Sequence, residues 1–280
     1  MRSTLRACIS TALFVLAAGA RAAAALPSET PGVLLEELTW AEAEAVLKPE
    51  TVVVIPLGAQ AKEHGLHLRL DVDWTMAEYF KRRVLERANV VVAPTVNYGY
   101  YPAFVEYPGS TTLELDTARD VIVQICRTLS AFGPRRFYVI NIGVSTVRSL
   151  EPAVERLAGE GILLRFLDVL KVTEPIAKKI ARQEGGTHAD EIETSMMLHI
   201  APGSVHMDLA RKDLEPRQGV RLTRAKGSAN TYSPTGVWGD ATLATREKGA
   251  TLVRGMLDGM LSEIEALRSS PHPSAARPVP

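Results

Sequence analysis

Cysteine is nearly absent from this chain, which has only Cys8 and Cys126 among its 280 residues. A disulfide framework is therefore excluded, and stability has to come from a hydrophobic core. Neither charge sign dominates, since Lys and Arg together number 32 and Asp and Glu together number 32. No sequence-wide field favours nucleic acid or acidic membranes as partners. We expect a local site for a small molecule, and no nucleic-acid partner.

The N-terminus carries the pattern of an export signal. Arg2 and Arg6 precede a short apolar segment, residues 7–18, and small residues suited to cleavage follow at 20–25. We interpret residues 1–25 as a signal peptide, and we expect the mature chain to be exported, periplasmic or secreted, without stable membrane insertion. The alternative is a retained anchor, although the apolar segment is short for a bilayer span. After cleavage only Cys126 remains.

Apolar runs and helical patterns alternate along the rest of the chain. The sequence predicts strands at 52–57, 89–94, 136–141 and 162–168, and helices at 38–47, 74–88, 117–132, 150–158, 191–200 and 246–267. Thr39 with Glu42 has the spacing of a capping box. This alternation predicts an α/β fold with a mostly parallel sheet covered on both faces. We expect one domain over residues 30–268 and a disordered tail over 269–280.

A histidine- and acid-rich stretch follows the first buried strand. It is Glu63-His-Gly-Leu-His-Leu-Arg-Leu-Asp-Val-Asp73, and it holds two of the six histidines. In α/β proteins ligands bind beyond the carboxyl ends of the strands. Imidazole and carboxylate groups suit Zn²⁺, Mn²⁺ or Fe²⁺. The stretch therefore predicts a metal site, with a solvated polar loop as the alternative.

A second polar cluster begins at Gly185 and leads into the helix at 191–200. His188 precedes acids that either complement the helix dipole or act in chemistry. An imidazole titrates near neutral pH, so His188 is a candidate for proton transfer or metal binding. The loop at 95–110 is rich in Tyr, and its aromatic rings are candidates for a small-molecule pocket or for packing.

These segments together resemble the creatininase family. Pro56-Leu-Gly58 with residues 63–73 is similar to the family's Pro-x-Gly and Glu-Gln-His-Gly-Pro-His motifs. Tyr107-Pro-Gly-Ser-Thr111 resembles Phe-Pro-Gly-Thr, residues 188–195 resemble His-Ala-Gly-Glu-x-Glu-Thr-Ser, and residues 243–249 resemble the C-terminal motif. The resemblance implies a three-layer α/β/α sandwich, in homo-oligomers, that hydrolyses cyclic or linear amide C–N bonds with paired divalent metals.

The resemblance assigns residues to roles only in part. It places His64 and Asp73 at metal-ligand positions, nine residues apart, and His188 at a catalytic position. Where the family has its other ligands, this chain has Lys62, Gly143 and Ser145. The predicted site is therefore rearranged, with Zn or Mn as one ion rather than two, or with none. We predict metal ligands His64, Asp73 and Glu63, catalytic residues His188 and Glu193, and substrate-binding residues His67, Glu106 and Tyr101.

Three functions remain open at this point. The first is a metal-dependent amidohydrolase for a small, cyclic or linear amide. The second is a catalytically inactive periplasmic binding or scaffold protein in which Lys62 provides a positive charge in place of a metal. The third is a serine-type hydrolase using Ser145 and His188, although no glycine follows the serine as in a nucleophile elbow.

Overall fold

The computed structural model describes residues 30–271. The predicted signal peptide and residues 272–280 of the predicted tail lie outside this range. The central sheet has five strands in the order β1-β3-β2-β4-β5, and every pair is parallel. The strands are β1 (Val33–Leu34), β2 (Val52–Leu57), β3 (Val91–Val92), β4 (Arg136–Asn141) and β5 (Leu163–Phe166).

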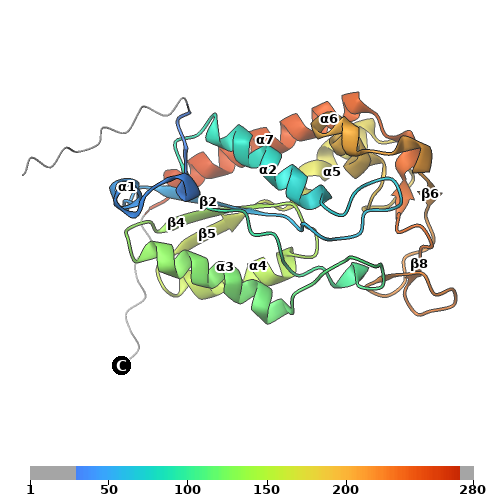
Figure 1. The fold of residues 1–280 in the computed structure, drawn as a ribbon, viewed down its shortest axis with the longest axis horizontal. Coiled ribbons are helices and arrows are strands. Elements are labelled where there is room, and N and C mark those ends of the chain that lie inside the picture. The colour runs from blue at the N-terminus through green and yellow to red at the C-terminus, as the bar shows by residue number, and fades with distance from the viewer. Residues whose placement is uncertain (1–29, 272–280) are drawn as a thin grey trace, which may run out of the picture.

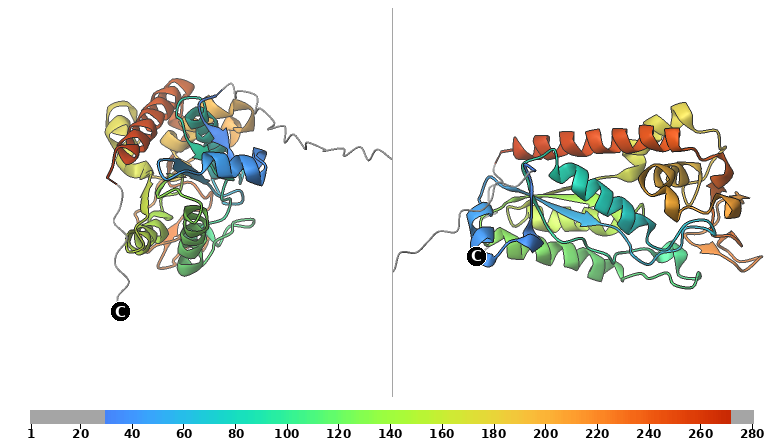
Figure 2. Two further views of the ribbon diagram at one scale, coloured as in Figure 1. Left: turned by 90° about the vertical axis from the view of Figure 1, so that its left-hand side faces the viewer. Right: turned by 45° about the horizontal axis from the view of Figure 1, so that its top comes forward.

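Helices cover both faces of the sheet (Figure 1, Figure 2). One face carries α2 (Val72–Leu85), α5 (Val169–Ile180), α6 (Glu191–Ile200) and α7 (Arg246–Arg268), and the other carries α3 (Leu115–Ser130) and α4 (Val147–Ala158). The short helix α1 (Trp40–Val46) lies at one end of the sheet (Figure 1). The predicted three-layer α/β/α sandwich with a parallel sheet is confirmed.

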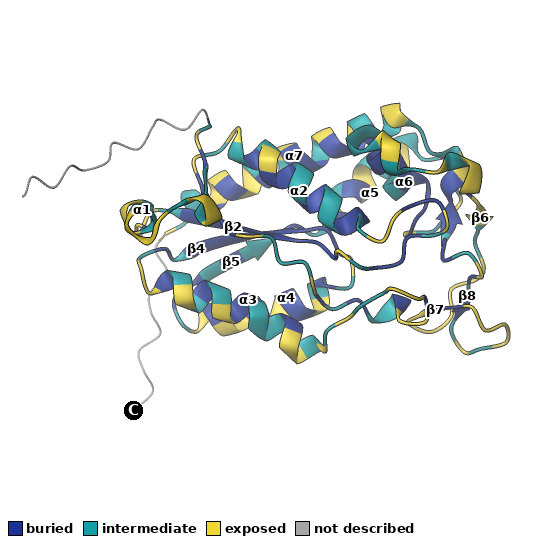
Figure 3. Cartoon of the chain, viewed as in Figure 1, coloured by how far each residue is buried: buried dark blue, intermediate teal, exposed yellow. Residues whose placement is uncertain are grey.

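The sheet builds two cores because its side chains alternate between faces. Val52 and Val54 of β2 pack with Met76 and Phe80 of α2 and with α7. Val53 and Ile55 turn the other way, into the core formed with α3 and α4. All six residues of β2 are buried, as expected for a central parallel strand. Figure 3 shows β2 and β4 in dark blue, and it shows yellow on the outward faces of the helices.

Several predicted elements agree closely with the structure. Thr39 caps α1, and its side chain and that of Glu42 bond reciprocally in a capping box. The helix predicted at 74–88 begins earlier, at Val72. The sequence patterns did not predict α5, which contains Pro175, or the two-residue edge strand β1. No helix in residues 30–271 is long and apolar enough to cross a membrane.

The carboxyl ends of β2 and β4 lead into the loops of the site. Two small sheets lie at this end of the molecule (Figure 1), formed by β6 (Lys212–Asp213) with β9 (Gly239–Asp240) and by β7 (Leu222–Thr223) with β8 (Thr231–Tyr232). Short 3₁₀ turns join the elements, at Leu35–Glu37 (η1), Pro102–Phe104 (η2), Pro202–Ser204 (η3), Met207–Leu209 (η4) and Ala241–Leu243 (η5).

Candidate metal centre

The loop after β2 is tied down on both sides. The backbone N–H of Lys62 donates to the carbonyl of Leu70, and the N–H of Glu63 donates to Ser110 Oγ at 2.9 Å. The Lys62 and His64 side chains both reach Asp73, whereas the intervening Glu63 contacts a different partner.

Asp73 is the negative centre of the site. It lies in the first turn of α2, where the helix dipole stabilises a carboxylate. Lys62 Nζ lies 2.9 Å from Asp73 Oδ2, and His64 Nε2 lies 2.9 Å from Asp73 Oδ1. Burial alone would raise the pKa of Asp73, but Lys62 and His64 outweigh it and hold that pKa below its usual value. Asp73 is therefore ionised.

The hydrogen bonds of His64 define what its second nitrogen must face. Nδ1 lies 2.9 Å from the carbonyl oxygen of Lys62, which can only accept, so Nδ1 carries a proton. Nε2 then faces two carboxylate oxygens, Asp73 Oδ1 at 2.9 Å and Glu193 Oε1 at 3.5 Å. A lone pair and two carboxylates repel one another unless a cation lies between them. That cation is either a proton on Nε2 or a metal ion.

The proton is bound firmly in the absence of a metal. Burial and Lys62 lower the pKa of His64, but Glu193 and Asp73 outweigh them and raise it to about 9. Glu193 is the third member of this group. Burial raises its pKa, whereas His64, His188 and Lys62 together bring it well below the usual range. In the absence of a metal, the protonated His64 imidazole thus lies between two ionised carboxylates.

Helix α6 brings Glu193 into the site through an unusual backbone conformation. Asp190 caps the helix by accepting from the N–H groups of Ile192 and Glu193. Ala189 has a φ of 46°, a region that residues other than glycine seldom adopt. Its N–H donates to Glu193 Oε2 at 2.7 Å, which fixes that carboxylate. Strain of this kind is retained where the surrounding structure needs it, often at functional sites.

His188 and Glu63 form a second pair beside the first group. His188 Nε2 lies 3.0 Å from Glu63 Oε2, and the imidazole packs against the Phe104 ring at 4.1 Å between centroids. His188 Nδ1 lies 3.7 Å from Glu193 Oε2. Gly236, at a φ of +80°, makes room for Glu63, because a Cβ there would overlap the Glu63 carboxylate. The pair thus adjoins the His64–Asp73–Glu193 group through Glu193.

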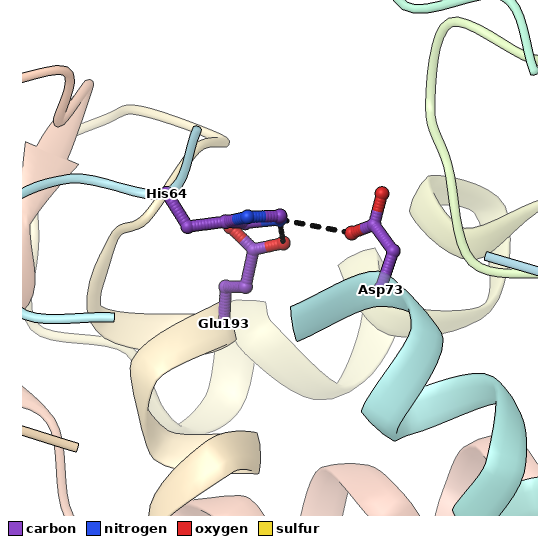
Figure 4. A group of neighbouring side chains, drawn as sticks. All are labelled: His64, Asp73 and Glu193. Atoms are coloured by element: carbon purple, nitrogen blue, oxygen red, sulfur yellow. Dashed lines mark hydrogen bonds and ion pairs between the residues drawn. The ribbon is translucent and has the colours of Figure 1, made fainter. Parts of the chain in front are cut away.

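The donor set suits one divalent ion. His64, Asp73 and Glu193 each offer a ligand atom, and these three atoms lie within 4.8 Å of one another (Figure 4). The carbonyl bond at Nδ1 is the kind of outer contact that orients a ligating imidazole. Glu63, predicted as a ligand, lies outside this group and contacts His188, whereas Glu193, predicted as catalytic, lies within it. Which residues bind a metal stays a prediction.

The positions of further family ligands do not support a second ion. At Lys62 an ammonium group is in the place of a carboxylate. At Gly143 a Cβ would lie 2.8 Å from the Tyr101 ring and from Thr146 Oγ1, so these side chains fill the space that a residue at 143 would need. Ser145 offers only a hydroxyl group. These three positions therefore offer no imidazole or carboxylate as a further metal ligand.

The predicted substrate-binding residues lie around the site rather than in its cavity. His67 is fully buried, and its Nε2 pairs with Thr194 Oγ1 at 2.8 Å. Burial lowers the pKa of His67 to about 4, so this imidazole is neutral. Tyr101 is buried beneath the Lys62 ammonium, 5.4 Å from its ring centroid, and Glu106 accepts from Thr223 Oγ1. The role of these three residues in substrate binding stays a prediction.

A cavity of about 190 Å³ opens onto the site. Lys62, His188 and Glu193 lie on its wall, together with Phe104 and Trp238. Ser145 also lines it, but no hydrogen bond joins Ser145 to His188 within the described residues. Arg148 and Arg217 line it as well, and no sequence motif pointed to these two arginines. A larger cavity of about 570 Å³ lies alongside between α5 and α6 and shares Glu193.

Fold and site together define an α/β/α protein with an imidazole–carboxylate group at the carboxyl edge of its sheet. Residues 36–264 match the family Creatininase, described as creatinine amidohydrolase. The chain belongs to the creatininase family, whose members are hydrolases. This agrees with the resemblance seen in the sequence.

Individual relatives are similar along most of the chain. A creatinine amidohydrolase of Pseudomonas putida is 28% identical over 253 residues, which cover 83% of this chain and 96% of the relative. A mycofactocin precursor peptide peptidase of Mycobacterium ulcerans (strain Agy99) is 28% identical over 222 residues, covering 76% and 84%. A solved structure of creatininase described with Mn superposes with a TM-score of 0.70 at 26% identity, covering 85% of this chain and 100% of the other.

Proposed function

We propose that this protein hydrolyses the amide bond of a small molecule with the help of one divalent metal ion held by His64, Asp73 and Glu193. The observation that carries the proposal is the convergence of His64 Nε2, Asp73 Oδ1 and Glu193 Oε1 on one point. Nitrogen and oxygen donors of this kind suit Mn²⁺ or Zn²⁺. A bound ion would polarise the substrate carbonyl.

Lys62 supplies a fixed charge where a second ion would otherwise be needed. Its ammonium is buried and paired with Asp73, and it lines the cavity. It also lies 4.9 Å from the Phe104 ring centroid, so the aromatic wall helps to hold it. In this position the ammonium compensates Asp73 and offers a positive charge toward a substrate oxygen.

His188 and Glu63 provide a route for proton transfer. The Glu63 carboxylate can only accept, so His188 Nε2 carries the proton of their 3.0 Å contact. Nδ1 is then the nitrogen at which His188 can take up or release a proton. Because His188 lines the cavity, it can deliver a proton to the leaving nitrogen of an amide. Glu63 orients the ring, and Phe104 packs against it.

The size of the cavity restricts the substrate. At about 190 Å³ it is smaller than pockets for drug-sized ligands. We therefore propose a small amide, cyclic or linear, as the substrate. The relatives named for creatinine and for a precursor peptide are consistent with amide bonds as the target class.

A second candidate function is that of a metal-free binding or scaffold protein. The Lys62–Asp73 ion pair favours it, because the ammonium already compensates the carboxylate that a metal would bind. A protonated His64 would complete a buried cluster that is neutral in charge, with Lys62 and His64 against Asp73 and Glu193. Such a protein would keep the cavity and lose the hydrolysis.

Metal analysis of the full-length protein separates the two functions. The purified protein is loaded with Mn²⁺ or Zn²⁺, desalted, and analysed for metal by mass spectrometry. We expect one ion per chain in the wild type and none in His64→Ala. His206→Ala, which removes an exposed imidazole outside the group, is the matched control and should retain the ion. Metal-free wild-type protein after loading would exclude the hydrolase proposal.

Location and assembly are also proposed rather than observed. We propose export through the N-terminal pattern at residues 1–25 and a homo-oligomeric state, as the family resemblance implies. Fractionation of the native host and size-exclusion chromatography with light scattering test these two points. Cytoplasmic, uncleaved protein would contradict the first, and a monomer at micromolar concentration would contradict the second.

A further inference from the structure

Two arginines line the small cavity without an acidic partner among the described residues. Arg148 lies in the first turn of α4, and Arg217 lies in the segment between β6 and β7. Neither forms an ion pair with an acidic residue in the described part of the chain, in contrast to Arg156 of α4, which pairs with Asp120. Guanidinium groups left unpaired beside a cavity are available to a ligand.

The Arg217 side chain is held in place without being neutralised. Its guanidinium lies over the Trp238 ring, 4.7 Å from the centroid, and one of its N–H groups donates to the carbonyl of Val220 at 3.3 Å. Both contacts leave the positive charge intact and several N–H donors free. Arg148 lines the same cavity, and burial together with this neighbouring cation lowers the pKa of Arg217.

The beginning of α4 adds a third positive element to the same wall. Ser145 and Arg148 line the cavity, and the helix starts between them. The Thr146 hydroxyl does not cap the helix, since it donates toward Asn141 and the Gly143 carbonyl. A 12-residue helix carries partial positive charge at its N-terminus.

The charges on the cavity wall do not balance. Three permanent cations, Lys62, Arg148 and Arg217, line it with one carboxylate, Glu193. Lys62 is already matched by Asp73. The excess positive charge therefore belongs to Arg148 and Arg217, which have no acidic partner among the described residues. A bound divalent ion would increase the excess.

We propose that the substrate is a small amide that also carries a carboxylate, which Arg148 and Arg217 bind while the amide faces His188 and Glu193. Planar guanidinium groups match the two oxygens of a carboxylate. The inference rests on the proposed function for the identity of the reacting bond, but the anion site itself is defined by residues outside the metal group. The substrate class is thus an N-acyl amino acid or a similar amide acid.

The test uses a matched pair of probes, N-acetylglycine and its neutral amide, N-acetylglycinamide. Both contain the same acetamide group, and only the first carries a carboxylate. Binding to the full-length protein is measured by calorimetry after chelator treatment, so that the carboxylate cannot bind a metal. We expect N-acetylglycine to bind at least 10-fold more tightly than the neutral amide. Equal affinity for the two probes would overturn the proposal.

Variants locate the binding to the two arginines. Arg148→Gln and Arg217→Gln should each weaken binding of N-acetylglycine at least 10-fold, whereas Arg156→Gln on the same helix should leave it unchanged. Unfolding temperatures without probe show whether the variants fold, and folded variants that bind N-acetylglycine normally would refute the assignment. Inorganic phosphate is the third probe. Tighter binding of phosphate than of N-acetylglycine would also overturn the proposal that the site binds a carboxylate.

The same samples distinguish failure of this inference from failure of the proposed hydrolase. Metal content after Mn²⁺ loading should be equal in the wild type, Arg148→Gln and Arg217→Gln, because neither arginine belongs to the donor set. A metal-free wild type that still binds N-acetylglycine through the arginines would leave the anion site standing without hydrolysis. A wild type that binds the metal but shows no preference for N-acetylglycine would leave the hydrolase proposal standing and overturn the anion site.

Discussion

Lys62 Nζ and Asp73 Oδ2 lie 2.9 Å apart in the interior, with side-chain exposures of 6% and 0%. This ion pair lies beside the three donors that could hold a metal, and it shares Asp73 with them. Removing one partner of a buried pair leaves the other charge uncompensated, which is far more costly than the pair itself is stabilising. The pair therefore couples protein stability to metal binding.

Lys62→Met should lower the stability of the metal-free protein and raise its affinity for a metal ion. The loss of the ammonium leaves Asp73 buried with less compensation, so we expect the free energy of unfolding to fall by about 3–5 kcal/mol. The same loss removes repulsion between Lys62 and a cation, so Mn²⁺ should bind at least 10-fold more tightly. Urea unfolding with and without Mn²⁺ measures both effects. Equal metal affinity in the two proteins would show that Lys62 does not compete with the ion.

Asp73→Asn should abolish metal binding, because it removes a charged donor from the group of three. Asp71→Asn is the control, since Asp71 is two residues away and pairs with Arg69 at the surface. We expect the control to bind one ion and to unfold within about 0.5 kcal/mol of the wild type. Metal analysis and urea unfolding of both variants check this. Retention of metal by Asp73→Asn would show that the ion binds at a different site.

His188→Gln should reduce catalysis without removing the metal. If His188 transfers a proton to the leaving group, kcat should fall by about 10²–10⁴-fold while metal content stays at the wild-type value. Glu63→Gln should have a smaller effect on kcat, because Glu63 acts by orienting His188. Steady-state kinetics with a hydrolysed amide provides the measurement. Unchanged kcat in His188→Gln would remove this residue from the mechanism.

Protonation of His67 should lower the free energy of unfolding in mild acid. Burial lowers its folded pKa to about 4, while the unfolded chain has a pKa near 6.5. A depressed pKa gives stability that is complete above about pH 6.5 and is lost as pH falls toward 4. At pH 4 the native imidazole is only about half protonated, so we expect a loss of about 2–3 kcal/mol.

The variant His67→Gln isolates this effect because it cannot gain a proton. The difference in unfolding free energy between wild type and His67→Gln should shrink by about 2–3 kcal/mol between pH 7.5 and 4. Asp190 contributes a slope of the opposite sign, since burial raises its folded pKa to about 6, but this term is common to both proteins and cancels. A constant difference across the pH range would mean that His67 takes up its proton equally in the native and unfolded states, so that its pKa is not lowered by folding.

Cys126 should be unreactive in the native protein. Its side chain is fully buried in the core between the sheet, α3 and α4, and burial raises the pKa of the thiol. Because the thiolate is the reactive form, modification should occur only when the chain unfolds. Ellman's reagent applied to a Cys8→Ser variant, with and without urea, measures this. Rapid reaction without urea would indicate that the core opens locally.

The fold was predictable because its signals are local and repeated. β2 and β4 have the predicted bounds, since continuous β-branched and aromatic runs mark central parallel strands. Helix α6 also has its predicted bounds, with Asp190 as its cap. The helix α5 was missed because Pro175 interrupts its pattern, and β1 was missed because two residues carry no periodicity.

The site was predictable only in its local part. His64 and Asp73 lie nine residues apart, and the helix start between them makes their contact depend on short-range geometry. The direction of Glu63 could not be deduced, because it depends on how the loop is fastened to Ser110. The selection of Glu193 as the third donor depends on the backbone turn at Ala189.

The sequence by itself determined the parallel α/β architecture, because strands and helices leave their periodicity in neighbouring residues. Its motifs also carried the resemblance that indicated the family and the pair His64 and Asp73. Only the tertiary structure decided that Lys62 pairs with Asp73, that Glu193 completes the donor group and that Arg148 and Arg217 face one cavity. These relationships join segments that are far apart in the chain. Their energies arise from burial and charge, which exist only after the layers have packed.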